Sequence, residues 1–229
     1  MKTIGLVGGT SWISSLDYYR LFNELTNQRL GGNEAAKIVL YSVNYGEIVT
    51  LTKKGDWDGI AAIIGDAAQK AEKAGADCIL LGANTMHNIA EKIQAMVNVP
   101  LLHIADAAAK AIKEKGLDTV ALLGTKYTMQ FDFYKKRLAE HGIHTIIPDE
   151  AGVEAVNNAI YNELGKGQFL PATRQLFIDI IEQLHQQGAG GVILGCTEIP
   201  MLVKQEDTEV PLFDTTFLHA KAAVDFALG

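Results

Sequence analysis

The chain has 229 residues, 48% of them hydrophobic and 21% charged, which is typical of a globular protein with one large domain or two of about 110 residues. Its net charge of −7 excludes the basic surface that general nucleic-acid or membrane-surface binding requires. Cys78 and Cys196 form no disulfide framework and no segment approaches the roughly 20 apolar residues of a membrane span, so we expect a cytoplasmic protein.

Short apolar runs alternate with longer helical patterns along the chain. The expected strands are Thr3–Val7, Lys37–Val43, Cys78–Leu81, Leu101–Ile104, Thr119–Leu123, His144–Ile147, Val192–Leu194 and Leu212–Phe213. The expected helices are Ser14–Arg29, Ile60–Ala74, Met129–Glu140, Ala172–Gln187, Glu198–Val203 and Phe217–Leu228. Continuous apolar strands are typical of a parallel sheet covered on both faces, and the repeated alternation predicts an α/β fold.

The two halves of the chain share phrases in the same order. GADCILLGANT at 75–85 corresponds to GAGGVILGCTE at 188–198, TIGLVG at 3–8 to TVALLG at 119–124, and VPL occurs at both 99–101 and 210–212. We therefore predict two duplicated, doubly wound α/β domains, 1–104 with 212–229 and 105–211, with the active site in the cleft between them. In this alignment Cys196 of the second copy corresponds to Ala83 of the first.

Ligands of doubly wound sheets bind beyond the carboxyl ends of the strands, where this chain has several turns with small polar residues. The candidate binding residues in these turns are Gly9, Thr10, Asn84, Thr85, Thr125 and Thr128. Each turn alone is equally typical of a tight turn or a helix cap. Several of them together would favour a small carboxylate or amino acid, and no dinucleotide or phosphate-loop motif is present.

Four further residues carry possible chemistry. Cys196 precedes an expected helix, whose N-terminus would lower the thiol pKa and favour nucleophilic or base chemistry, whereas Cys78 is more simply a core residue. His87 either points into the cleft or has a surface or capping role. Lys166 lies in a glycine-flanked loop, as either a solvated lysine or a mobile cation for a carboxylate. No residues have metal-ligand spacing, so no metal is expected.

Longer phrases make the chain resemble the cofactor-independent aspartate/glutamate racemase family over nearly its whole length. They are GLVGGTSW, DYYRLFNE, SVNYGEI, NTMH at 84–87, LLGTKYTM at 122–129, FYKKRL and LGCTEIP at 194–200. The resemblance implies two α/β domains of like topology, a homodimer, aspartate or glutamate as substrate and no cofactor. It also implies two cysteines, one removing the α-proton from one face and the other returning a proton to the opposite face.

By this resemblance Cys196 is one catalytic base, and the second cysteine belongs where the chain has Ala83. The substrate carboxylates would be held by Asn84, Thr85, Thr125, Thr128 and Lys166, with Thr197 beside the thiol. A missing base costs about 10²–10⁴-fold in rate. Three functions therefore stay open: a weak or direction-biased racemase, a one-cysteine lyase or isomerase of small carboxylic acids, and a non-catalytic amino-acid binding protein.

Overall fold

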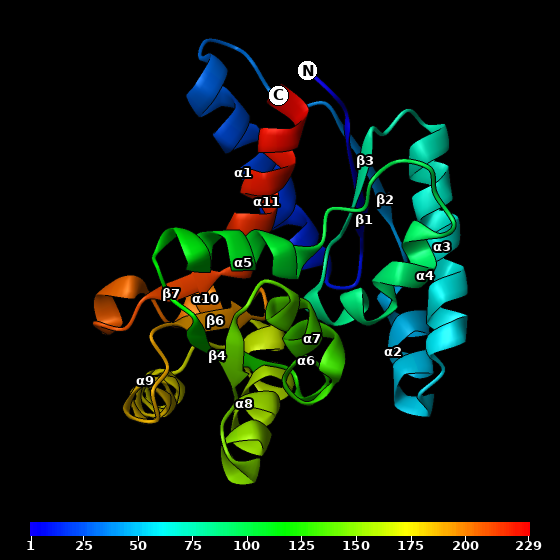
Figure 1. The fold of residues 1–229 in the computed structure, drawn as a ribbon. Coiled ribbons are helices and arrows are strands. Elements are labelled where there is room, and N and C mark those ends of the chain that lie inside the picture. Colours follow the sequence, from blue (N-terminus) through cyan, green and yellow to red (C-terminus); the bar gives the residue numbers. More distant parts are fainter. The chain divides into compact units, whose positions relative to one another are not determined.

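The computed structural model describes residues 1–229, which form two compact units. Met1–Ile104 with His219–Gly229 make the N-terminal unit, and Ala105–Leu218 make the C-terminal unit. The chain passes between the units within helix α5 (Ile104–Glu114) and again within helix α11 (Thr215–Leu228). Each unit contains one parallel β-sheet covered by helices (Figure 1).

The sheet of the N-terminal unit has the strand order β2-β1-β3, all parallel. Its elements are β1 (Ile4–Gly8), α1 (Trp12–Leu30), β2 (Ile38–Ser42), α2 (Tyr45–Lys54), α3 (Trp57–Lys73), β3 (Cys78–Leu81), the 3₁₀ helix η1 (Asn84–Ile89) and α4 (Ala90–Gln94). Because successive side chains of a strand point to opposite faces, Leu6 and Leu80 pack with α1 and α11, and Val7 and Leu81 pack with α3. Figure 1 shows α1 and α11 on one side of these strands and α3 on the other.

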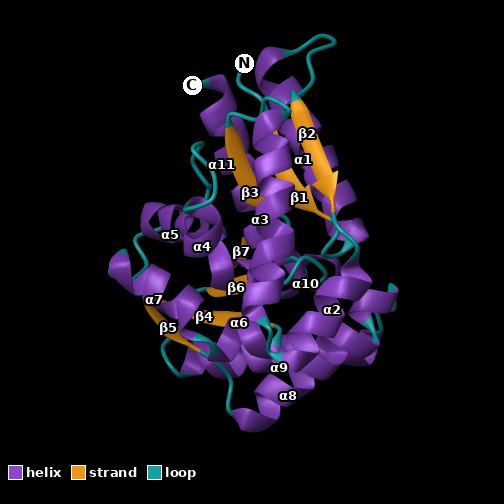
Figure 2. Ribbon diagram, turned by 90° about the vertical axis from the view of Figure 1, so that its right-hand side faces the viewer, coloured by secondary structure: helices purple, strands orange, loops and turns teal.

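The sheet of the C-terminal unit has the strand order β5-β4-β6-β7, again all parallel. Its elements are β4 (Thr119–Gly124), α6 (Lys126–Gln130), α7 (Asp132–Glu140), β5 (His144–Ile146), α8 (Glu150–Asn162), the 3₁₀ helix η2 (Leu164–Lys166), α9 (Pro171–Gln186), β6 (Val192–Gly195), α10 (Ile199–Leu202), the 3₁₀ helix η3 (Gln205–Asp207) and β7 (Leu212–Asp214). Leu123 and Leu194 pack with α8 and α9 on one face of this sheet. Figure 2 shows the strands of both sheets lying among helices.

The two sheets correspond strand by strand, and the predicted α/β class with parallel sheets is confirmed. The order β2-β1-β3 matches β5-β4-β6, and β7 has its counterpart in a single parallel bridge between Ile79 and Leu101. The expected strand Leu101–Ile104 is therefore wrong in extent. It is reduced to one bridge because the chain already enters α5 at Ile104.

A glutamine in each unit fixes the segment that enters this fourth strand position. Gln94 donates from Nε2 to the carbonyl of Val99 (3.1 Å) and accepts at Oε1 from the N–H of Leu101 (2.7 Å). Gln205 makes the corresponding bonds, to the carbonyl of Val210 (3.0 Å) and from the N–H of Leu212 (2.9 Å). The duplication of the sequence thus extends to individual side-chain hydrogen bonds.

The predicted return to the N-terminal domain at residue 212 is wrong. Residues 212–214 form β7, which pairs with β6 in the register Val192 to Leu212 and Leu194 to Asp214. This pairing keeps the segment in the C-terminal unit as far as Leu218, and the N-terminal unit resumes at His219. The second boundary between the units therefore lies within α11, and not at residue 212 as predicted.

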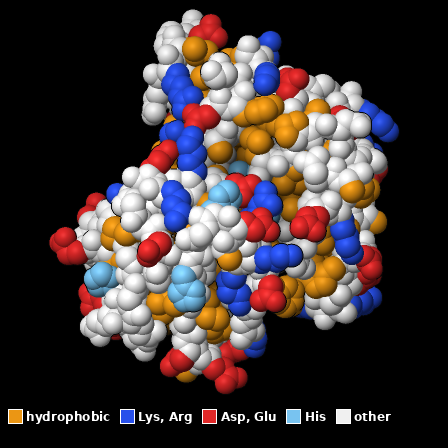
Figure 3. Space-filling view, viewed as in Figure 1, with side chains coloured by type: hydrophobic (Ala, Val, Ile, Leu, Met, Phe, Trp, Pro, Cys, Tyr) orange, Lys and Arg blue, Asp and Glu red, His pale blue; other side chains and the backbone are white.

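The surface carries charges of both signs. Basic and acidic side chains are interspersed over the face drawn in Figure 3, and exposed pairs such as Arg20 with Glu24 (2.7 Å) and Lys70 with Asp66 (2.6 Å) lie one turn apart on their helices. Such exposed pairs contribute little to stability. None of the helices combines the length and apolar character needed to cross a bilayer.

Candidate active site

The turn after β1 carries Gly9 and Thr10. Gly9 has a φ of 87°, and a Cβ at this position would lie 2.2 Å from the carbonyl oxygen of Val43, so the turn needs glycine here. The N–H of Gly9 donates to Ser15 Oγ at 2.9 Å. Ser11 caps α1, a helix of 19 residues. The sequence and the close approach of β2 therefore fix this turn at the start of a long helix.

Thr10 is buried in this turn, with 6% of its surface exposed, and its hydroxyl makes no hydrogen bond within the protein. Leaving a buried hydroxyl without a partner costs about 1–3 kcal/mol. Most buried side-chain polar atoms in proteins have a partner. The hydroxyl of Thr10 is therefore available to a ligand at the carboxyl end of β1.

Ala83, Asn84 and Thr85 lie beside this turn, because β3 is the neighbour of β1 and Gly82 N–H bonds to the Val7 carbonyl at 2.9 Å. Ala83 has an extended backbone (φ −153°, ψ 141°) and a partly buried methyl group that packs against the core. Asn84 is buried and begins η1, and Thr85 follows within that helix. The structure thus brings the predicted residues of this unit to one sheet edge.

His87 has a structural role, because both nitrogens of its ring are hydrogen-bonded to backbone groups. Its Nδ1 lies 3.1 Å from the carbonyl oxygen of Ala83, and its Nε2 accepts from the N–H of Ile104 at 3.2 Å. These bonds fix a neutral ring with the proton on Nδ1. Burial, together with the nearby His103 and His219 rings, lowers the pKa of His87 well below its usual value. The His87 ring is therefore neutral at pH 7 and is not a source of protons there.

Thr125 and Thr128 lie at the carboxyl end of β4. Thr125 Oγ1 accepts from the N–H of Thr128 (3.3 Å) and lies 3.2 Å from Thr128 Oγ1, and both residues are buried. Gly124 pairs with Gly195 of β6, and a Cβ on Gly124 would lie 2.8 Å from the carbonyl oxygen of Gly195. The paired glycines therefore bring the end of β4 close to the end of β6, which leads directly into Cys196.

The thiol of Cys196 hydrogen-bonds to a carboxylate two residues further on. Cys196 Sγ donates to Glu198 Oε2 at 2.9 Å, and Thr197 Oγ1 donates to the same oxygen at 2.8 Å. Glu198 is itself buried, with 8% of its surface exposed. Glu198 stands in the same LGCTEIP phrase as the cysteine, but the sequence pattern placed it at the start of an expected helix and gave it no chemical role.

The expectation of a lowered thiol pKa at Cys196 is wrong. Burial of the sulfur raises the pKa of Cys196 well above its usual value, and the negative charge and hydrogen bond of Glu198 raise it further. The helix dipole that would lower this pKa is small, because α10 begins only at Ile199 and has four residues. At neutral pH the group is therefore a thiol that donates to a carboxylate.

Lys166 stands apart from this arrangement. It ends η2 and is exposed, followed by Gly167 in the left-handed conformation (φ 74°). Its ammonium group makes no ion pair, and no hydrogen bond joins it to Cys196 or Thr125. The structure does not bring Lys166 together with the other predicted residues of the C-terminal unit.

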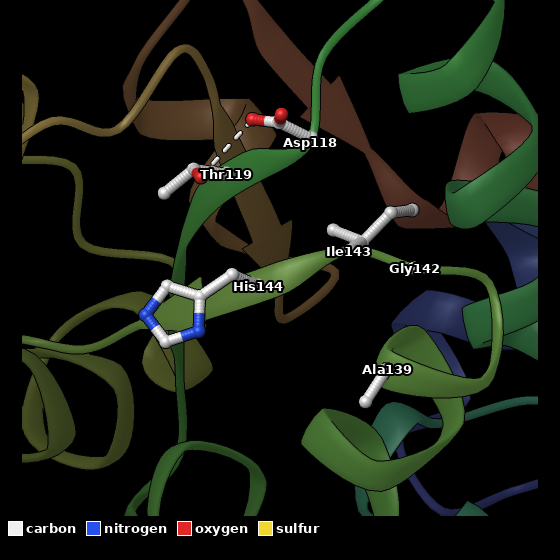
Figure 4. A pocket seen from close by; sticks show the side chains of 6 residues that line it. All are labelled: Asp118, Thr119, Ala139, Gly142, Ile143 and His144. Carbon is white, nitrogen blue, oxygen red and sulfur yellow. Dashed lines mark hydrogen bonds between the residues drawn. The ribbon is translucent and has the colours of Figure 1, made fainter.

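A hollow of about 420 Å³ lies elsewhere on the C-terminal unit (Figure 4). It is lined by Asp118, Thr119, Ala139, Gly142, Ile143 and His144. Thr119 and His144 are the first residues of β4 and β5, so the hollow lies at the amino ends of the strands. Ligands of doubly wound sheets bind at the opposite edge, and this hollow is therefore not the candidate active site.

Two parallel α/β sheets, with a hydrogen-bonded thiol–carboxylate pair at the end of a central strand, define an α/β protein with a candidate acid–base site. Residues 7–223 match the sequence model of the Asp/Glu/Hydantoin racemase family. The chain belongs to this family, and it is an enzyme of the isomerase class.

Individual relatives agree with this assignment. The broad specificity amino-acid racemase RacX of Bacillus subtilis (strain 168) is 32% identical over 174 residues, covering 76% of this chain and 75% of that protein. A crystal structure from Yersinia pestis, provisionally described as an Asp/Glu racemase, is 48% identical with a TM-score of 0.95 and covers 100% of both chains. An aspartate racemase homologue from Pyrococcus horikoshii is 36% identical with a TM-score of 0.89, again over 100% of both chains.

Proposed function

We propose that this chain is a cofactor-independent amino-acid racemase in which Cys196 is the dominant base and Ala83 occupies the place of the second. One observation carries the proposal: the Cys196 thiol directly follows the central parallel strand β6 and is hydrogen-bonded to a buried carboxylate, in a chain of the racemase family. A thiolate there would remove the α-proton of an amino acid, leaving the electron pair on the substrate as a carbanion. No pyridoxal or metal has a part in this scheme.

The other polar residues at the strand ends would bind the substrate. We assign its carboxylates to the N–H groups and hydroxyls of the turns already described, whose donors stabilise negative charge as it develops. The assigned residues are Gly9, Thr10, Asn84, Thr85, Thr125, Thr128 and Thr197, with Lys166 as a mobile cation. The substrate class is a small amino acid such as aspartate or glutamate. We further propose a cytoplasmic homodimer.

Solvent exchange tests the proposal most directly. The purified protein is incubated in D₂O with each enantiomer of aspartate, glutamate and several neutral amino acids, and the α-proton signal is followed by NMR while chiral chromatography follows inversion. We expect exchange to be faster than inversion, because only one face has a thiol.

The Cys196→Ala variant should exchange the α-proton at least about 10²-fold more slowly than wild type. Cys78→Ala is the matched control, since Cys78 is a core residue and its loss leaves the reacting thiol in place. Full exchange by Cys196→Ala would refute the assignment.

The asymmetry between Cys196 and Ala83 favours a second candidate. A lyase or isomerase that protonates a carbanion of a small carboxylic acid on one face needs one thiol only. Such an enzyme would release carbon dioxide or a geometric isomer rather than the opposite enantiomer. Product analysis separates the two, and tight binding of an amino acid without any exchange would instead indicate a binding protein.

A further inference from the structure

The mechanism proposed above leaves the buried carboxylate of Glu198 unused. Glu198 has 8% of its surface exposed, and its Oε2 accepts from the Cys196 thiol and from the Thr197 hydroxyl at 2.9 and 2.8 Å. A buried carboxylate is costly unless it is well hydrogen-bonded, so its position beside the thiol calls for a reason.

We propose that Glu198 is the proton acceptor for Cys196, so that the thiol and the carboxylate share one proton and form the reactive thiolate together. This inference rests on the proposed function and adds a residue to it. Glu198 touches the thiol and not the reacting carbon, so it is a supporting residue that acts through Cys196.

The proton balance of the pair is simple. The S–H bond of Cys196 breaks with its electron pair left on sulfur, and the proton forms an O–H bond on Glu198. The pair keeps one net negative charge throughout, so the buried site gains no charge in forming the thiolate. The thiolate then takes the α-proton of the substrate, and the C–H electron pair stays on the substrate. Because the S–H bond already points at Glu198 Oε2, the first transfer needs no rearrangement.

The alternative is that Glu198 only repels the thiolate. Burial and the charge of Glu198 both raise the pKa of Cys196, so removing the charge would then make the thiolate easier to form and the enzyme faster. If Glu198 is instead the proton acceptor, removing its carboxylate should make the enzyme slower. Glu198→Gln separates the two, because the amide oxygen still accepts a hydrogen bond but no longer takes the proton.

The experiment measures two quantities on wild type, Glu198→Gln and Glu198→Asp. One is the alkylation rate of Cys196 by iodoacetamide against pH, read on its peptide by mass spectrometry. The other is α-proton exchange of the best amino acid in D₂O. For Glu198→Gln we expect a lower alkylation midpoint together with exchange slower by about 10²-fold, and partial recovery in Glu198→Asp. Glu206→Gln, the same change at an exposed glutamate of this unit, is the matched control.

Exchange by folded Glu198→Gln at or above the wild-type rate would overturn the inference. If Glu198→Gln does not fold, Glu198→Asp decides, because its shorter side chain should still slow exchange. If wild type exchanges no amino acid, the proposed racemase fails, and alkylation alone decides. A pH-independent alkylation rate below the midpoint in wild type, lost in Glu198→Gln, then supports the shared proton, because the proton moves between sulfur and oxygen without leaving the pair. Its absence in wild type overturns the shared proton, since a lowered midpoint alone also follows from charge repulsion.

Discussion

Ala83 and Cys196 follow corresponding strands, β3 and β6, and differ in the one property that proton transfer needs. Cys196 has a thiol bonded to Glu198, whereas Ala83 has a partly buried methyl group on an extended backbone. His87 does not fill the gap, because both of its ring nitrogens are bonded to backbone groups. At the residue scale the chain therefore has one titratable side chain where its sequence repeat provides two positions.

Ala83→Cys should restore the second group. The residue precedes η1 and is only partly buried, so a sulfur in place of one hydrogen should fit with little strain. We expect the ratio of inversion to exchange to rise at least about 10-fold, since a general acid on the second face contributes 10²-fold or more when well placed. Chiral chromatography and NMR on the same samples measure the ratio.

Ala83→Ser is the control for this variant, because it adds a polar atom of similar size without a readily ionised group. A folded Ala83→Cys protein with an unchanged ratio would show that the site has diverged beyond the loss of one thiol.

At the scale of elements, each sheet depends on a glutamine that holds the segment before its last strand position. Gln205 donates from Nε2 to the carbonyls of Thr208 (3.1 Å) and Val210 (3.0 Å), and accepts from Leu212 N–H (2.9 Å). Gln94 likewise accepts a hydrogen bond from the N–H of Leu101 in the N-terminal unit, yet the strand there is reduced to a single bridge. The glutamine thus positions the entering chain, and the onset of the next helix decides how long the strand becomes.

Gln205→Glu should destabilise the protein by about 2 kcal/mol. The carboxylate keeps the acceptor for Leu212 but loses two donors and places a negative charge against two carbonyl oxygens, and each lost bond costs about 1 kcal/mol. Urea unfolding followed by circular dichroism measures the change. Gln186→Glu, at an exposed position in the last turn of α9, is the control. Equal stability of the two variants would contradict the role given to Gln205.

At the scale of the whole molecule, His87 couples the fold to pH. It is buried and neutral, with its Nε2 bonded to Ile104, the residue at which the N-terminal unit passes into α5. Its pKa lies well below the ordinary value of 6.5, chiefly because of burial. Below pH 6.5 the unfolded chain therefore binds a proton on His87 that the folded chain does not, and the free energy of unfolding falls as pH falls.

The expected slope from this one group approaches 1.4 kcal/mol per pH unit between pH 6.5 and the lowered pKa. Urea unfolding at intervals between pH 7.5 and 5 measures it. His87→Asn should be less stable at neutral pH but should show a smaller slope, because the titrating ring is gone. His144→Asn, at an exposed position, should keep the wild-type slope. An unchanged slope in His87→Asn would contradict the prediction.

The sequence by itself determined the parallel α/β class, the duplication and the candidate turns, because apolar runs, glycines and repeated phrases are local features. It placed the strands to within a residue or two, apart from Leu101–Ile104, where the early start of α5 leaves one bridge. It also assigned 212–218 to the wrong unit, because strand pairing between distant segments is not a local property.

Only the tertiary structure decided the chemistry of the individual groups. It showed that Cys196 is a partly buried thiol with a raised pKa, that this thiol donates a hydrogen bond to Glu198, and that His87 is a neutral structural ring. Burial and the identity of a hydrogen-bond partner depend on atoms that folding brings together from other segments. The residue type in a motif therefore predicts which chemistry a side chain is capable of, and the surroundings of that side chain decide its protonation state.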